Sequence, residues 1–155
     1  MEAVLKELLN HWEIVAAILA AIWTIHTYSN AQKESRSWSR TRILLEQANI
    51  FETDPQICSA VLILEGRHPD IKVETLFSSS GEPNNERYGK EIQAFDRMLN
   101  FLQRLGYASI ALESLSKEEL ELFGWYYSRI LEESRLSKYC DKYGFPCVIE
   151  FAGKI

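Results

Sequence analysis

The hydrophobic pattern of the chain begins with a run that carries no charge. It extends from Ile14 to Ile25, IVAAILAAIWTI, and Trp12 and Tyr28 flank it with aromatic rings of the kind found at membrane interfaces. As a helix this run is only about 18 Å long against a hydrocarbon core of roughly 30 Å, whereas a helix from Leu8 to Tyr28 is long enough. The pattern therefore predicts a single transmembrane helix within an N-terminal membrane anchor at residues 1–30.

A buried helix in a soluble bundle is the alternative for this segment, because a run of this length also fits a protein core. A secretory signal peptide fits poorly. Signal peptides begin with basic residues, whereas Glu2, Glu7 and Glu13 precede or border the run and only Lys6 opposes them. We therefore expect a single-pass membrane protein.

Four basic residues follow the apolar run: Lys33, Arg36, Arg40 and Arg42, opposed only by Glu34. We call these four residues the basic collar. By the positive-inside rule, they place the rest of the chain, residues 31–155, in the cytoplasm. The alternative role of the collar is contact with anionic lipid or nucleic acid, since each cation gains about 1 kcal/mol near anionic headgroups.

Apolar residues at helical spacing predict that residues 31–155 form a small bundle, which makes the chain all-α. Residues 31–51 continue the first helix, because neither Gly nor Pro interrupts them. Asp54 and Pro55 suit the N-cap and the first position of a second helix, and Gly66 suits its end.

The rest of the body follows a loop at residues 78–85, SSSGEPNN. An amphipathic helix is predicted from about Glu86, and it continues past Gly106 because apolar residues go on. Ser116 and Glu119 have the spacing of a capping box that opens a further helix. The core expected between these two helices consists of Phe95, Leu99, Leu102, Phe123 and Leu131.

Two shorter segments are less regular. Residues 71–77 fit a short strand or one helical turn, and the lack of an evident partner strand favours the turn. The chain after Pro146, CVIEFAGKI, is apolar, and we predict that it packs as an extended tail across the bundle.

Composition supports a folded domain and disfavours a nucleic-acid binder. The chain has 155 residues, 46% of them hydrophobic, which is enough for a core. Its net charge of −5 gives no general attraction for nucleic acid. Cys58, Cys140 and Cys147 lack a metal-binding spacing and are expected to be reduced, with a Cys140–Cys147 disulfide as the alternative.

No residues show the spacing of a catalytic or cofactor site. The three histidines, His11, His26 and His68, lie in different segments, and none is followed three or four residues later by a second His, Cys or carboxylate. No serine lies in a G-x-S-x-G turn, and no glycine begins a P-loop. We therefore expect no enzyme, no cofactor and no metal. Asn100, an amide beside core positions, is expected to bond to another helix rather than to a ligand.

The aromatic triplet Trp125, Tyr126 and Tyr127 is the best candidate for a contact surface. Successive helical residues are about 100° apart, so three rings cannot all face one core stripe. Phe123, Tyr127 and Ile130 fit that stripe, which leaves Tyr126, and after it Trp125, for a partner protein or a second copy of the chain. Core packing is the alternative for one or two of these rings.

The segment from Leu99 to Glu133, LNFLQRLGYASIALESLSKEELELFGWYYSRILEE, resembles an uncharacterised bacterial family of short proteins. The family pattern pairs a helix carrying L-N-F with a second carrying L-F-G, and here these elements are Leu99–Phe101 and Leu122–Gly124. The resemblance implies one N-terminal membrane helix in the bacterial inner membrane and a helical cytoplasmic domain. It covers about the C-terminal third and the overall layout, and the apolar tail after Tyr143 departs from it.

Together these patterns predict a membrane-anchored interaction module whose cytoplasmic helical body is an accessory or regulatory subunit of a larger complex. Its expected partners are membrane lipid and either another protein or a second copy of the chain. The alternative function is contact of the basic collar with anionic lipid or nucleic acid.

Overall fold

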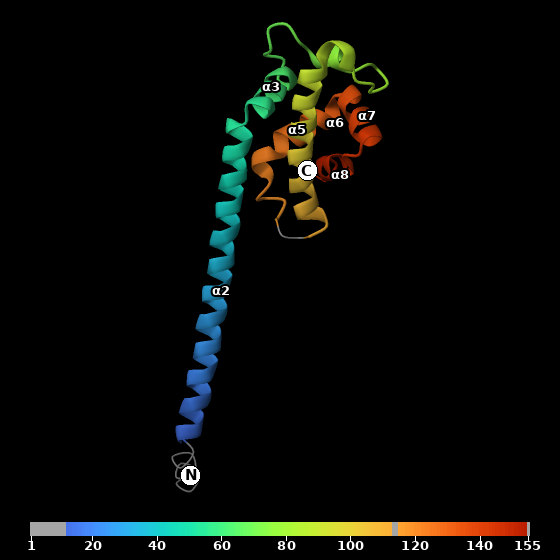
Figure 1. The fold of residues 1–155 in the computed structure, drawn as a ribbon. Helices are drawn as coiled ribbons and strands as arrows, with labels where there is room; N and C mark the ends of the chain where they lie inside the picture. The colour runs from blue at the N-terminus through green and yellow to red at the C-terminus, as the bar shows by residue number, and fades with distance from the viewer. Residues whose placement is uncertain (1–11, 113–114, 155) are drawn as a thin grey trace. The chain divides into compact units, whose positions relative to one another are not determined.

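The computed structural model describes residues 12–112 and 115–154, and it confirms that the chain is all-α (Figure 1). The chain divides into two units, Met1–Ile43 and Leu44–Ile155. Among the described residues, the β pairing is limited to an isolated bridge between Phe77 and Pro83. In chain order the helices are α2 (Trp12–Thr53), α3 (Pro55–Leu64), α4 (Val73–Leu76), α5 (Asn85–Ile110), the 3₁₀ helix η1 (Glu121–Phe123), α6 (Gly124–Glu132), α7 (Ser134–Tyr143) and α8 (Pro146–Ala152).

The first unit consists, in its described part, of the helical residues of α2 from Trp12 to Ile43. The helix continues without a break past residue 30, as predicted for residues 31–51. Within the described part of the chain, no helix combines the length and the apolar character needed to cross a membrane. Residues 8–11, with which the predicted span begins, lie outside the described residues.

A capped corner connects α2 to α3, as the sequence predicted. The carboxylate of Asp54 accepts hydrogen bonds from the backbone N–H groups of Gln56 and Ile57 at 3.0 and 3.3 Å. Pro55 occupies the start of α3, where its missing N–H costs nothing. The helix ends before Gly66, whose φ of +71° lies in the region that favours glycine.

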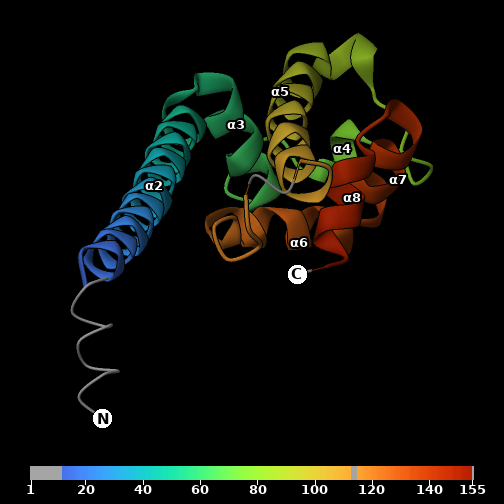
Figure 2. The ribbon, with the colours of Figure 1, turned by 90° about the horizontal axis from the view of Figure 1, so that it is seen from below.

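Helix α5 is the central element of the second unit. It packs most extensively against α3 and α8, which lie on different sides of it (Figure 2). Its apolar stripe is fully buried at Phe95, Met98, Leu99 and Leu102. The short segment before it contains α4, so the predicted helical turn in residues 71–77 is confirmed.

Four of the five predicted core residues are buried, namely Phe95, Leu99, Leu102 and Phe123. The prediction is wrong for Leu131, which is 39% exposed. Helix α6 turns Tyr127 and Ile130 into the core, and Leu131 lies about 100° further round the helix.

The predicted capping box forms, but an α-helix does not follow it directly. The Ser116 N–H donates to Glu119 Oε2 at 2.6 Å, and the Glu119 N–H donates to Ser116 Oγ at 3.2 Å. A turn and the 3₁₀ helix η1 come next, and α6 begins only at Gly124. The box therefore opens a tighter element than the sequence predicted.

The prediction of an extended tail is wrong, because the chain after Phe145 forms the helix α8. Pro146 stands at its first position, and Val148, Phe151 and Ala152 are buried at the spacing of one helical face. Helix α7 precedes it and ends at Tyr143, before Gly144, whose φ is +92°.

Candidate functional site

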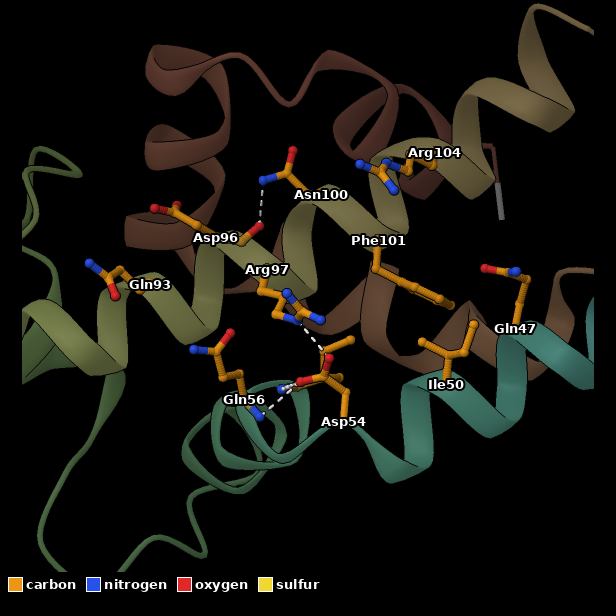
Figure 3. Close-up of a pocket in the computed structure, with 11 residues that line it drawn as sticks. Gln47, Ile50, Asp54, Gln56, Gln93, Asp96, Arg97, Asn100, Phe101 and Arg104 are labelled. Carbon is orange, nitrogen blue, oxygen red and sulfur yellow. Dashed lines mark hydrogen bonds and ion pairs between the residues drawn. The ribbon is translucent and has the colours of Figure 1, made fainter.

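A polar groove lies within the second unit, between the end of α2, the start of α3 and one face of α5 (Figure 3). Its cavity volume is about 660 Å³, within the usual range for ligand sites. The residues that line it are Gln47, Ile50, Asp54, Gln56, Ile57, Gln93, Asp96, Arg97, Asn100, Phe101 and Arg104.

A stripe of α5 forms one wall of the groove. Its main members follow one another at steps of three or four residues, or stand side by side, so they lie on one face of the helix. This face is opposite the buried stripe of α5. The members are Gln93, Arg97, Asn100, Phe101 and Arg104.

The floor of the groove is apolar. Ile50 of α2 and Phe101 of α5 point toward each other across it (Figure 3). The Phe101 ring packs against the rings of Phe51 and Phe123, with centroids 5.2 and 5.6 Å apart. The floor is therefore attached to the aromatic core of the second unit.

Asp54 connects the three helices of the groove. One carboxylate oxygen caps α3, and the other accepts a hydrogen bond from Arg97 Nε of α5 at 2.6 Å (Figure 3). Burial by itself would raise the pKa of this carboxyl, but the bond from Arg97 and the N–H groups of Ile57 and Gln56 together lower the pKa below its ordinary value. Asp54 is thus held as a carboxylate at neutral pH.

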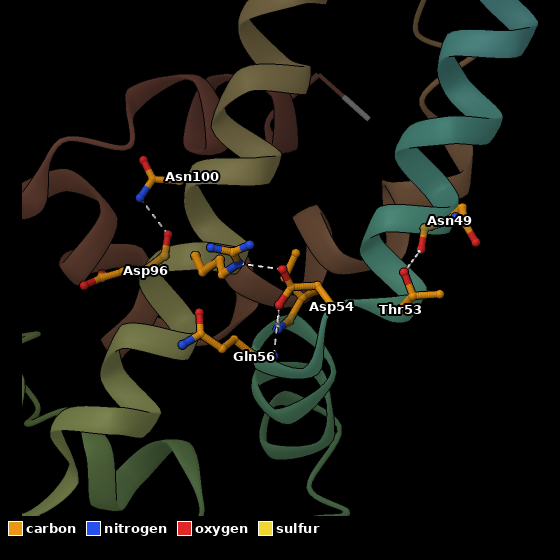
Figure 4. A network of polar contacts seen from close by, with 8 residues as sticks. Asn49, Thr53, Asp54, Gln56, Asp96 and Asn100 are labelled. Atoms are coloured by element: carbon orange, nitrogen blue, oxygen red, sulfur yellow. Dashed lines mark hydrogen bonds and ion pairs between the residues drawn. The ribbon is translucent and has the colours of Figure 1, made fainter.

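Asp96 and Asn100 lie on α5 close to Arg97. Asp96 accepts a hydrogen bond from the Tyr139 hydroxyl of α7 at 2.6 Å. Asn100 Nδ2 donates to the Asp96 backbone oxygen at 2.8 Å, within the same helix (Figure 4). The predicted bond from Asn100 to another helix is therefore wrong, because Asn100 lies on the exposed side of α5 and lines the groove.

Several polar groups of the groove have no partner in the described part of the chain. These are the side-chain amides of Gln47, Gln56 and Gln93 and the guanidinium of Arg104. Each amide can donate and accept a hydrogen bond, and the guanidinium can bind a carboxylate or phosphate in two-pronged fashion. The lining contains neither Ser, Cys nor His. Its chemistry suits recognition through hydrogen bonds.

Reasoning from the sequence missed this groove. Neither Arg97 nor Arg104 belongs to a recognisable motif on its own. Together with Gln93 and Asn100, however, they recur at helical spacing on the polar face of α5. The signal that this face forms a wall, the bond from Arg97 to Asp54, joins residues 43 positions apart and is not readable from local spacing.

The aromatic triplet occupies three different environments. Tyr127 is fully buried, and its hydroxyl donates to the Leu102 backbone oxygen at 2.6 Å. Tyr126 is half-buried, with its ring 4.8 Å from that of Phe51. Trp125 is 50% exposed and packs edge-on against Tyr126. Tyr126, the ring preferred as a contact residue, thus lies partly covered by Phe51 of α2, and Trp125 is the more exposed of the two. That the triplet forms a contact surface stays a prediction.

The basic collar lies on α2 in the first unit. Lys33, Arg40 and Arg42 are exposed, and they form no ion pair with residues that the structure describes. For Arg36 the structure describes the backbone only. Contact of the collar with anionic groups stays a prediction.

The three cysteines are free thiols. Cys140 is fully buried, and burial raises the pKa of its thiol to about 12. The alternative of a Cys140–Cys147 disulfide is thus not realised.

Comparison with known proteins gives no assignment: no family model matches the chain, and no significant match is found among curated proteins or solved structures. The resemblance of Leu99–Glu133 to a bacterial membrane-protein family stays a prediction.

Proposed function

We propose that the chain is a membrane-tethered interaction module, an accessory or regulatory subunit whose helical body lies in the cytoplasm. The observation that carries the proposal is the exposure of large apolar side chains along α2. Leu19 is 62% exposed, Trp23 71% and Ile25 69%. Removing apolar side chains of this size from water is favourable, so we expect another molecule to bury them.

The apolar surface surrounds the helix instead of forming one stripe. The large side chains of Ile14, Ile18, Leu19, Ile22 and Trp23 occupy about half of the circumference, and alanines occupy most of the rest. A helix that is apolar all round has no side suited to water and is buried on every side. A bilayer provides such a cover, whereas a single partner helix covers only one stripe.

The hydroxyl groups of this helix also suit hydrocarbon. Thr24 Oγ1 donates to the Ala20 backbone oxygen at 2.8 Å, and Thr27 Oγ1 donates to the Trp23 backbone oxygen at 2.9 Å. Polar groups without water must be satisfied within the helix, and these two are. The basic collar after Tyr28 supports the cytoplasmic orientation of the body.

The exposed Trp125 and the polar groove support the role as an interaction module. Trp is enriched among the residues that contribute most to protein interfaces, and the groove offers hydrogen-bonding groups without partners. A partner protein bound to the tethered body accounts for both.

Fractionation of cells that express the full chain tests the tether. Wild-type protein should stay in the membrane pellet after an alkaline wash. The double variant Ile18→Glu/Ile22→Glu should move to the supernatant, because an acidic residue at the centre of a membrane helix costs about 2.5 to 3.5 kcal/mol.

The matched control is Ser35→Glu/Ser39→Glu, which places the same charges on the same helix beyond the apolar run and should remain in the pellet. Wild-type protein that is soluble without detergent would show that the tether is wrong.

A further inference from the structure

We propose that the groove between α2, α3 and α5 binds an extended segment of a partner protein that carries an acidic side chain. This inference rests on the proposed function, since it gives the chemistry of the partner that the module binds. It commits to main-chain recognition by carboxamides and to a carboxylate at the Arg104 end of the groove.

The length of the groove suits a short extended segment. Arg104 lies 11 positions after Gln93, so the polar stripe of α5 is about 16 Å long. An extended chain rises about 3.3 Å per residue, and about five residues fill that length. A folded domain would instead need a flatter and larger surface.

The carboxamides of the groove match a peptide main chain. Gln47 comes from α2, Gln56 from α3 and Gln93 from α5, so amides stand on each of the three helices that enclose the groove. None of these side chains bonds to another described residue. Each offers one C=O and one NH₂ group, the same donor and acceptor types as a peptide unit.

Two charged side chains of the groove have no oppositely charged partner among the described residues, and they lie toward different ends. Asp54 pairs with Arg97 through Nε, whereas Asp96, near the Gln93 end, accepts a hydrogen bond from the Tyr139 hydroxyl, which brings no positive charge, so a second carboxylate is disfavoured at that end. Arg104, at the other end, is exposed and forms no ion pair with a described residue. A carboxylate on the bound segment would give this guanidinium the partner that the chain itself does not supply.

The apolar floor gives the segment a place for alternate side chains. Ile50 is 44% exposed although it faces Phe101 across the groove. In an extended segment every second side chain points to the same side, so apolar residues two positions away from the acidic one point to its side and reach this floor. The rings that support Phe101 hold it in place before binding, which reduces the entropy cost of recognition.

The test uses the ¹⁵N-labelled full chain in detergent micelles and two capped heptapeptides. The first, Ser-Leu-Ser-Glu-Ser-Leu-Ser, places Leu, Glu and Leu on one side, and in the second Gln replaces Glu. We expect the Glu peptide to shift resonances of groove residues in NMR spectra. The Gln peptide should bind about tenfold more weakly, because it cannot form the charged pair.

Variants of the protein locate the binding site. Arg104→Gln should weaken binding of the Glu peptide about tenfold and leave the thermal transition unchanged, because the guanidinium has no described partner to lose. The matched control is Arg87→Gln, an exposed arginine near the start of α5 outside the groove lining, which should bind like wild type.

A Glu peptide with N-methylated backbone amides tests main-chain recognition and should bind poorly. Equal binding of the two unmethylated peptides, full affinity of Arg104→Gln, or no shift of groove resonances would each overturn the proposal. Binding of glucuronate in place of the peptides would also overturn it and would assign the groove to an acidic sugar. These titrations do not depend on the membrane, so their failure and the failure of the tether are separate results.

Discussion

At the residue scale, the carboxylate of Asp54 makes both local hydrogen bonds, which cap a helix, and a long-range bond to another helix. Its Oδ1 satisfies N–H groups that the first turn of α3 would otherwise leave unpaired, and its Oδ2 holds Arg97 of α5. The same residue therefore ends α2, begins α3 and fixes the wall of the groove. Its charge state should matter for stability.

Because the folded-state pKa of Asp54 is lowered, its contribution to stability is present above the unfolded-state pKa and is lost as pH falls through the folded-state pKa. Wild-type protein should thus lose more stability than Asp54→Ala between neutral pH and about pH 2. At neutral pH the variant should be less stable by about 1 kcal/mol through loss of the cap.

Urea denaturation at several pH values measures this difference. Asp141→Ala, which removes an exposed carboxylate, is the control and should follow the wild-type pH dependence. A variant at position 54 whose pH dependence equals that of wild type would show that the carboxylate is not coupled to folding.

The residues that the sequence predicted correctly are those with local causes. The cap of α3 involves positions two and three apart, so Asp54 followed by Pro55 was sufficient to find it. The partial burial of Tyr126 was not predictable in this way, because the Phe51 ring that packs against it lies 75 positions away in the sequence. Helical spacing gives the direction of a side chain relative to its own helix, but it does not show which other element lies there.

At the element scale, α8 shows where composition misleads. The apolar composition after Pro146 predicted an extended tail across the bundle, yet its buried positions recur at helical spacing and Pro146 stands where a helix begins. Gly106 of α5 allows α8 to pack closely against α5, because a Cβ at position 106 would lie only 2.9 Å from the Cys147 backbone oxygen. The sequence predicted that the helix continues past Gly106, but not that another helix packs against it there.

Phe123 of η1 packs against rings of both α2 and α5, so we expect its loss to destabilise the second unit. This ring is 3% exposed and lies 5.4 Å from Phe51 and 5.6 Å from Phe101. Phe123→Ala should lower the free energy of unfolding by about 3 to 5 kcal/mol, because it leaves a cavity among three elements. Leu131→Ala should cost less than about 1 kcal/mol, since its side chain is largely outside the core.

Urea denaturation of the two variants compares positions that the sequence had placed in the same core. Similar losses of unfolding free energy in the two variants would show that Leu131 is packed in the core. An unchanged unfolding free energy for Phe123→Ala would show that η1 is not part of the core.

At the scale of the whole molecule, the buried hydrophobic residues among those described all lie between Leu44 and Ala152. The prediction of an all-α protein is confirmed, because helical periodicity and capping signals act within single elements. The groove could not be predicted in the same way, since α2 and α5 contribute to it from positions about 50 residues apart. Pairing of distant elements depends on packing that no single segment encodes.

The location of the core predicts that residues 44–155 fold without the rest of the chain. The fragment should show a helical circular-dichroism spectrum and one cooperative thermal transition, because every ring contact among the described residues lies inside it. Of the four tryptophans, at positions 12, 23, 38 and 125, only Trp125 remains, so fluorescence reports on that ring alone. Since Trp125 is 50% exposed, its emission should be readily quenched by iodide in the folded fragment, and unfolding should increase quenching only moderately. Full-length protein in detergent is the comparison and should unfold at a similar temperature.

Two outcomes would contradict these predictions. A fragment that lacks a cooperative transition would show that the residues before Leu44 take part in the core. A Trp125 that iodide does not quench in the folded fragment would show that this ring is packed inside the protein instead of lying at a contact surface.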